Sequence, residues 1–126
     1  MSNSIHRVLI VEDDNIISLV LVNMIKQMGH EVVGTTTNGR EAIELANELD
    51  PSLILMDIRL KGDLDGIETV MAIKEKKDVA VIYVTGNTDK QHFDRAKESG
   101  FVDLISKPFT ARDLEKSLDK VKASQF

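Results

Sequence analysis

The sequence predicts an α/β domain built on a doubly wound parallel sheet. Its 126 residues are the length of a single domain. Along the chain, short apolar runs alternate with longer segments of helical period, which is the pattern of strand and helix units around a parallel sheet. Some of the short runs are apolar at every position, as expected of strands that helices cover on both faces.

The first strand and helix lie at the start of the chain. Residues 8–11 form an apolar run rich in β-branched side chains, and this run leads into the acidic residues 12–14. A segment of helical period over 15–28 then ends at Gly29, a residue type that commonly follows the last turn of a helix. The predicted order is therefore strand, acidic loop and helix.

Two further strand and helix units follow. A weaker strand is predicted over 30–34 and a helix over 40–49. Residues 53–56 are apolar at every position and stop at Asp57, so we expect a strand that is buried on both faces. The next helix is predicted over 66–76. The residues expected along one side of these two helices are Ala42, Ile43, Ala46, Leu49, Ile67, Val70, Met71 and Lys74.

The last two units complete the alternation. A near-continuous apolar run over 79–84 predicts a strand, and a polar helix is predicted over 88–98, closed by Gly100. The final strand is predicted over 101–105, and residues 107–109 lead into the last helix. The apolar stripe of that helix is Ala111, Leu114, Leu118 and Val121. Strict alternation of strands and helices predicts a doubly wound sheet with helices on both faces.

Composition excludes several classes of function. Sixteen Lys and Arg against twenty-one Asp and Glu give a net charge of −5, which disfavours direct contact with nucleic acid. The chain has no cysteine, which excludes disulfides, thiolate zinc sites and thiol catalysis and favours a reducing, cytoplasmic location. No apolar run approaches the roughly 20 residues that span a bilayer, and residues 1–7 lack a signal pattern, so no membrane association is expected.

Polar residues follow four of the predicted strands at the point where each strand ends. Glu12 and Asp13 follow the first strand, Asp57 the third, Thr85 the fourth and Lys107 the fifth. In a doubly wound sheet, ligands bind at the carboxyl ends of the strands, near the point where the strand order reverses. The sequence therefore predicts that these residues meet at one edge of the sheet.

The chemistry of this set points to a metal and a phosphoryl group. Clustered carboxylates repel one another unless a cation lies among them, and oxygen ligands without His or Cys favour Mg²⁺. With a divalent ion and the charge of Lys107, the site could neutralise an incoming phosphoryl group, for which a carboxylate is a competent nucleophile. The hydroxyl of Thr85 could donate to the same group.

Each of these residues also has a purely structural explanation when it is taken alone. Asp13 or Asp14 would serve as the cap of the first helix, and Thr85 as an ordinary strand residue. Asp57 and Lys107 would be solvated loop charges. The coincidence of polar groups at four strand ends favours one shared site over four independent explanations.

The motifs together resemble those of a known family. They are Glu12-Asp13 after the first strand, Asp57 after the third, Thr85-Gly86 after the fourth and Lys107-Pro108-Phe109 after the fifth. Over nearly its whole length the chain resembles the receiver domain of two-component response regulators, the chemotaxis-type phosphoacceptor fold. The resemblance implies a flavodoxin-like sheet of five parallel strands in the order 2-1-3-4-5. It also implies a single receiver domain over 1–126, with no output domain in this chain.

The resemblance implies a role for each site residue. Asp57 would accept a phosphoryl group from a histidine kinase, and the domain would be a phosphoacceptor with self-catalysed phosphorylation and dephosphorylation, not an enzyme. Mg²⁺ would be held by the side chains of Asp13 and Asp57 and the backbone carbonyl of Arg59, and by Glu12 through water. Lys107 would pair with the phosphoryl oxygens.

Further residues are implied to act in switching. Thr85 would move toward the phosphoryl group and bias the domain between two conformations that control partner binding. Gly86 would leave access to the acyl phosphate, and the peptide bond between Lys107 and Pro108 is expected to be cis. Leu104 stands where the family usually carries an aromatic switch residue.

Two more departures from the family pattern lie near the acceptor. The loop over 59–66 is one residue longer than the common form, and Lys61 occupies a position where proline is frequent. Glu12 replaces the commoner aspartate, which lengthens the arm toward the metal without changing its charge.

The resemblance implies protein partners. The first helix has more apolar residues than one buried stripe needs, and we expect Ile16 and Val20 to contribute to docking of a sensor histidine kinase or a histidine phosphotransfer protein. The alternative is that these residues pack at the helix margins. A downstream protein partner is expected at the fourth and fifth helices, and a homodimer is a further arrangement. The chain either acts alone or is part of a longer regulator or hybrid kinase.

Two rival functions are disfavoured by the first loop. A haloacid-dehalogenase-type phosphatase has its nucleophile after the first strand in an Asp-x-Asp pattern, whereas this chain has Glu12-Asp13-Asp14 and no room for a cap domain. A flavin-binding module on the same topology needs a hydroxyl- and glycine-rich loop there to bind phosphate through backbone N–H groups. Acidic residues fill that loop instead.

Overall fold

The computed structural model describes residues 5–86 and 90–124. Its strands are β1 (Arg7–Val11), β2 (Glu31–Thr36), β3 (Leu53–Met56), β4 (Ala80–Thr85) and β5 (Asp103–Ser106), and its helices are α1 (Asn15–Gln27), α2 (Gly39–Leu49), α3 (Gly66–Lys74), α4 (Lys90–Ser99) and α5 (Ala111–Ser124). The strands form one sheet in the order β2-β1-β3-β4-β5, and every neighbouring pair is parallel. The predicted doubly wound architecture and strand order are confirmed.

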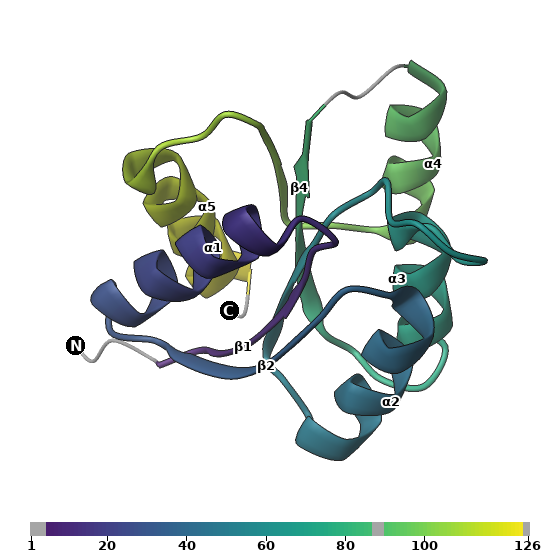
Figure 1. The fold of residues 1–126 in the computed structure, drawn as a ribbon, viewed down its shortest axis with the longest axis horizontal. Coiled ribbons are helices and arrows are strands. Elements are labelled where there is room, and N and C mark those ends of the chain that lie inside the picture. Colours follow the sequence, from purple (N-terminus) through teal and green to yellow (C-terminus); the bar gives the residue numbers. More distant parts are fainter. Residues whose placement is uncertain (1–4, 87–89, 125–126) are drawn as a thin grey trace.

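The helices cover the two faces of the sheet unequally. Figure 1 shows α1 and α5 on one face and α2, α3 and α4 on the other. Side chains alternate between the faces along each strand, so that in β1 Leu9 and Val11 enter the core under α2 to α4, whereas Val8 and Ile10 enter the core under α1 and α5. Within the described ranges, no helix has the length and apolar character needed to cross a bilayer.

Some element boundaries differ from the prediction. β2 continues to Thr36 because it pairs with β1 along the whole of that strand, with Val11 opposite Thr36. α3 ends at Lys74, and β5 begins at Asp103. The predicted start of the fourth helix at Thr88 lies outside the described residues.

The predicted inward stripe of α3 is wrong at one position. Met71 is 47 % exposed, and Ile73 takes the buried place beside Ile67 and Val70. α3 packs against both the sheet and its neighbouring helices, so its buried surface is wider than a single stripe. A rule based on one apolar face therefore misassigned Met71.

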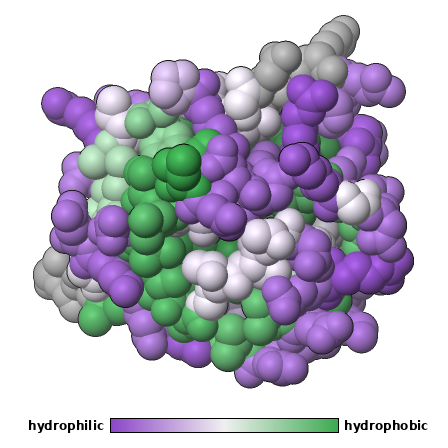
Figure 2. Space-filling view, in the orientation of Figure 1, coloured by the Kyte–Doolittle hydropathy of each residue, from purple (hydrophilic) through white to green (hydrophobic). Residues whose placement is uncertain are grey.

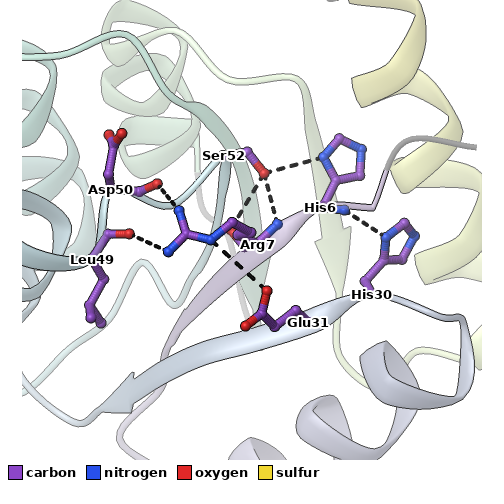
Figure 3. Close-up of polar contacts among 7 residues, drawn as sticks. All are labelled: His6, Arg7, His30, Glu31, Leu49, Asp50 and Ser52. Carbon is purple, nitrogen blue, oxygen red and sulfur yellow. Dashed lines mark hydrogen bonds and ion pairs between the residues drawn. The ribbon is translucent and has the colours of Figure 1, made fainter.

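The amino-terminal edge of the sheet is held by polar contacts of its own. The guanidinium of Arg7 donates to the backbone carbonyls of Leu49 and Asp50, both at 2.7 Å, and so binds the carboxyl end of α2 (Figure 3). The backbone N–H of His6 donates to Nδ1 of His30 at 3.0 Å, which ties the chain entering β1 to the chain entering β2. These contacts lie at the edge opposite the carboxyl ends of the strands.

Candidate functional site

The strand order brings the predicted site residues together. Glu12 and Asp13 follow β1, Asp57 follows β3, Thr85 is the last residue of β4 and Lys107 follows β5. These four strands are neighbours in the sheet and run parallel, so their carboxyl ends meet at one edge. Backbone bonds hold the loops in place: the N–H of Asp57 donates to the carbonyl of Val11 at 2.9 Å.

Three carboxylates form the centre of the site. One carboxylate oxygen from each of Glu12, Asp13 and Asp57 lies within 4.8 Å of the others. Glu12 and Asp57 are buried, and Asp13 is half-buried. Such a set of oxygen donors has the chemistry that Mg²⁺ prefers, so the residues present fit this ion.

The cap of α1 is Asp14, which separates its role from that of Asp13. Oδ1 of Asp14 accepts the backbone N–H groups of Ile16 and Ile17 at 2.9 and 3.2 Å. The backbone N–H of Asp14 in turn donates to Oε2 of Glu12 at 3.0 Å. The structural explanation left open for Asp13 or Asp14 therefore applies to Asp14, and Asp13 belongs to the carboxylate cluster.

Lys107 faces two of the three carboxylates. Its Nζ lies 2.8 Å from Oε1 of Glu12 and 3.5 Å from Oδ2 of Asp57. Burial lowers the pKa of the Lys107 amine, but the hydrogen bond to Glu12 and the charge of Asp57 outweigh burial and raise it. The amine is therefore a fixed positive charge at the site.

The backbone of Lys107 is also fixed. The peptide bond between Lys107 and Pro108 is cis, the isomer that the family resemblance implies. The N–H of Lys107 donates to the carbonyl of Thr85 at 2.8 Å. This bond joins the ends of β4 and β5 beside the carboxylates.

The carboxyl of Glu12 has a pKa well above its ordinary value, chiefly because it is buried. Burial raises the pKa of its carboxyl to about 7, the hydrogen bonds from Lys107 and from the N–H of Asp14 oppose that rise, and neighbouring Asp57 adds to it. One lysine beside three carboxylates leaves the cluster short of positive charge. A bound cation would relieve this shortage and favour the ionised form of Glu12.

Thr85 carries a buried hydroxyl at the end of β4, the strand between β3 and β5. Its side chain is fully buried, and within the described part of the chain Oγ1 has no hydrogen-bond partner. An unsatisfied buried hydroxyl costs about 1–3 kcal/mol, so this hydroxyl is available as a hydrogen-bond donor. A Cβ added at the adjacent Gly86 would meet Lys107 Cδ at 3.8 Å, which is an ordinary contact among the described atoms.

The loop after β3 packs directly on the end of that strand. The backbone N–H of Arg59 donates to Oδ1 of Asp57 at 3.1 Å, and that of Gly66 donates to the carbonyl of Ile58 at 2.8 Å. A Cβ at Gly66 would lie 2.0 Å from the carbonyl oxygen of Asp57. Glycine is required here because the start of α3 touches the backbone of Asp57, a close approach that the sequence prediction did not foresee.

Leu104 lies in β5 opposite Tyr83 of β4, half-buried against the core under α2 to α4. Tyr83 is the chain's one tyrosine; its ring is buried and its hydroxyl lies 2.7 Å from Oγ of Ser99 in α4. The aromatic group beside Leu104 is therefore on β4, one strand away from the position at which the family resemblance implies one. The sequence prediction missed this side chain because it lies inside an apolar run.

The residues expected to dock a kinase form an exposed apolar patch on α1. Ile16 is 76 % exposed and Val20 39 %, with Leu19 between them also exposed. Figure 2 shows a hydrophobic area over the part of this face where α1 lies. The alternative that Ile16 packs at the helix margin does not apply, because most of its surface is in contact with solvent.

Comparisons with known proteins agree with the geometry. The family model described as the response regulator receiver domain matches residues 8–119. The chain is 36 % identical over 116 residues to the chemotaxis protein CheY of Thermotoga maritima, covering 91 % of this chain and 96 % of that protein. It is 34 % identical over 108 residues to the transcriptional regulatory protein PdtaR of Mycobacterium tuberculosis, covering 86 % of this chain and 52 % of that protein. The chain thus spans about half of PdtaR.

Solved structures show the same fold. The signal receiver domain of a modulated diguanylate cyclase from Desulfovibrio desulfuricans G20 matches with a TM-score of 0.88 and 33 % identity, covering 96 % of this chain and 99 % of that one. The response regulator domain of Thermotoga maritima CheB matches with a TM-score of 0.82 and 32 % identity, covering 94 % of this chain and 98 % of that one.

Proposed function

The chain belongs to the response regulator receiver domain family, and we propose that Asp57 is its phosphoacceptor, taking a phosphoryl group from a histidine kinase. The observation that carries this proposal is the place of Asp57. Its carboxylate is buried at the end of β3, within 4.8 Å of two other carboxylates and 3.5 Å from the Lys107 amine. A nucleophile, a cation and a metal-type donor set thus lie together at one edge of the sheet.

The transfer is a displacement at phosphorus. A carboxylate oxygen of Asp57 forms the new O–P bond, the P–N bond of the phosphohistidine breaks, and the electron pair of that bond goes to the imidazole nitrogen of the donor. Lys107 offsets the negative charge of the phosphoryl oxygens, and the buried hydroxyl of Thr85 donates a hydrogen bond to one of them. The N–H of Arg59 holds Asp57 in place through Oδ1.

The metal site belongs to the same proposal. The side chains of Asp13 and Asp57 and the carbonyl of Arg59 would hold Mg²⁺, with Glu12 reaching it through water. When bound, the ion supplies positive charge against the phosphoryl oxygens. The crowded carboxylates support this assignment, because three acidic groups lie together with one lysine amine beside them.

Switching and partner binding follow from the phosphorylation. Thr85 moves toward the phosphoryl group because its hydroxyl has no other partner among the described residues, and Gly86 beside it leaves access to the acyl phosphate. The exposed apolar residues Ile16 and Val20 dock the phosphodonor protein, and α4 and α5 contact a downstream protein or a second copy of the chain. Leu104 takes the place of the aromatic switch residue, so Thr85 switches without the usual aromatic partner at that position.

The proposal is tested by intact-mass measurement after incubation with a small-molecule phosphodonor and Mg²⁺. We expect one phosphoryl addition to the wild type, none when the metal is chelated and none on Asp57→Asn. Asp63→Asn is the matched control, because it removes an exposed carboxylate outside the cluster, and it should be labelled like the wild type. Equal labelling of Asp57→Asn would refute the assignment. Repeated release of phosphate from varied monoesters would indicate a phosphatase instead.

A further inference from the structure

We propose that Arg95 of α4 is a positioning residue for the metal site, acting through Asp65 on the loop that carries the carbonyl of Arg59. Nη1 of Arg95 lies 2.9 Å from Oδ2 of Asp65, and the two side chains are 39 % and 24 % exposed. The inference rests on the proposed function, because it assumes that the Arg59 carbonyl binds Mg²⁺.

Asp65 is fixed on α3 by a full set of hydrogen bonds. Its Oδ1 accepts the backbone N–H of Glu68 at 2.8 Å, and Oε1 of Glu68 accepts the backbone N–H of Asp65 at 2.9 Å. The hydroxyl of Thr69 donates to the carbonyl of Asp65 at 2.7 Å. One carboxylate oxygen therefore caps α3 while the other binds α4, so a movement of Arg95 acts on the first turn of α3.

The first turn of α3 packs against the backbone of Asp57, the proposed phosphoacceptor. Gly66 follows Asp65 directly, and its Cα approaches the carbonyl of Asp57 so closely that a Cβ would lie 2.0 Å from the oxygen. The N–H of Gly66 also donates to the carbonyl of Ile58 at 2.8 Å. A shift of this turn therefore displaces the backbone of Asp57 and Ile58, and with it the adjacent carbonyl of Arg59.

The loop over 59–65 needs such an anchor because most of its residues are exposed. A second arginine also reaches it: Nε of Arg40 in α2 lies 2.9 Å from Oδ2 of Asp63. Both side chains of that pair are about two thirds exposed, at 67 % and 65 %, so solvent screens it and it contributes little. The pair of Arg95 and Asp65 is more buried and bears on the helix cap, so it is the effective anchor of the two.

The experiment is a Mg²⁺ titration of the protein uniformly labelled with a nitrogen isotope. Binding is followed by NMR through the backbone amide resonances of Asp57 and Arg59. The variants are Arg95→Ala, Asp65→Asn and the double variant, with Arg40→Ala as the matched control for lost positive charge. Asp65→Asn keeps a good helix cap, because Asn caps as well as Asp, and removes the charge that Arg95 binds. Amide spectra and thermal melts verify that each variant is folded at the titration temperature.

Arg95→Ala and Asp65→Asn should each weaken Mg²⁺ binding by about threefold, the size expected of a partly exposed ion pair. The double variant should bind no more weakly than either single variant, because all three lack the same interaction. Arg95→Lys should restore part of the affinity. In phosphorylation assays, the Mg²⁺ concentration for half-maximal rate should rise by the same factor, while the rate at saturating Mg²⁺ stays unchanged.

Several outcomes would overturn the inference. The first is an unchanged Mg²⁺ affinity in folded Arg95→Ala, and the second is a double variant in which the two losses of Mg²⁺ affinity add. The third is an equal loss of Mg²⁺ affinity in Arg40→Ala. The fourth is a reduced phosphorylation rate at saturating Mg²⁺ with no change in Mg²⁺ affinity. Failure of the proposed function has a different signature: the wild type itself would neither bind Mg²⁺ at these amides nor become labelled on Asp57.

Discussion

Asp13 differs from the other two carboxylates of the cluster in its relation to Lys107. The amine of Lys107 lies 2.8 Å from Glu12 and 3.5 Å from Asp57, whereas Asp13 is the half-buried member whose charge adds to the crowding. Like charges at this separation raise the free energy of the folded state. In the protein without metal, the charge of Asp13 is therefore expected to oppose folding.

Asp13→Asn should stabilise the metal-free protein and abolish its response to Mg²⁺. We expect the free energy of unfolding to rise by about 1 kcal/mol, because one of three clustered charges is removed. Mg²⁺ should stabilise the wild type through mass action and leave the variant unchanged. Urea unfolding with and without Mg²⁺ measures both effects.

The matched control for this variant is Asp14→Asn. It changes the charge of the next residue, and Asn preserves the cap of α1. Its stability should stay within about 0.5 kcal/mol of the wild type, and its response to Mg²⁺ should persist. A Mg²⁺ response in Asp13→Asn as large as that of the wild type would contradict the placement of Asp13 at the metal.

At the level of single residues, the sequence predicted the members of the site better than their mutual contacts. Asp57, Thr85 and Lys107 were predictable because polar residues that end neighbouring parallel strands must meet at one edge of the sheet. The contact between Arg95 and Asp65 was not predictable, because the two residues are thirty positions apart in the chain. Locally, Arg95 resembles other charges on a helix surface, and Asp65 resembles an ordinary helix cap.

Among the elements, β5 is the edge strand beside α5, and one acidic side chain joins the two. Oδ2 of Asp103 accepts the hydroxyl of Ser117 at 2.5 Å and lies 3.2 Å from Nζ of Lys120. Burial alone raises the pKa of the Asp103 carboxyl, but the hydrogen bonds from Ser117, the backbone of Leu104 and Lys120 bring it below its ordinary value. The ionised carboxylate therefore stabilises the fold.

Asp103→Asn should destabilise the protein at neutral pH and not in strong acid. The folded-state pKa lies below the unfolded-state value, so the stabilisation is present above about pH 4 and is lost as pH falls through the folded-state pKa. We expect the variant to lose about 1 kcal/mol of unfolding free energy at pH 7 relative to wild type. Urea unfolding between pH 7 and pH 2.5 should show that this gap closes.

Asp119→Asn serves as the control, since Asp119 is an exposed acid on the same helix. Its free energy of unfolding should equal that of the wild type at every pH in this series. If Asp103→Asn remained less stable than the wild type by the same amount in acid, the side chain would act by packing and not by its charge.

The elements themselves were predictable because their signals are local. Residues 53–56 are apolar throughout and become β3 with the same limits, and Gly29 follows α1 as expected of a helix end. Errors arose where tertiary pairing decides the limits. β2 continues through two threonines because β1 supplies partners as far as Val11, and no sequence pattern within β2 indicates this.

Across the whole molecule, the site and the apolar patch of α1 lie next to each other. The loop after β1 contributes Glu12 and Asp13 to the site and then enters α1, whose residue Ile16 is 76 % exposed. A protein that docks on Ile16 and Val20 would thus bring its phosphorylated side chain close to Asp57. The polar contacts of His6 and Arg7 hold the opposite edge of the sheet (Figure 3).

Replacing both Ile16 and Val20 with Ser should slow transfer from a histidine kinase domain that phosphorylates the wild type. We expect a loss of about tenfold, because two apolar contacts are removed from a docking surface. Labelling by a small-molecule phosphodonor should be unchanged, since that reaction needs no docking. Met71→Ser, which removes an exposed apolar side chain on α3, should transfer normally. Unchanged kinase transfer to the folded double variant would disprove the docking assignment.

We propose that Asp57 becomes phosphorylated in a reaction that depends on Mg²⁺. The most direct measurement is to incubate the protein with a small-molecule phosphodonor, reduce the acyl phosphate with borohydride and locate the reduced residue by tandem mass spectrometry. We expect modification at Asp57 with Mg²⁺ and none after chelation. Modification at another residue, or modification of Asp57 that persists undiminished without Mg²⁺, would contradict it.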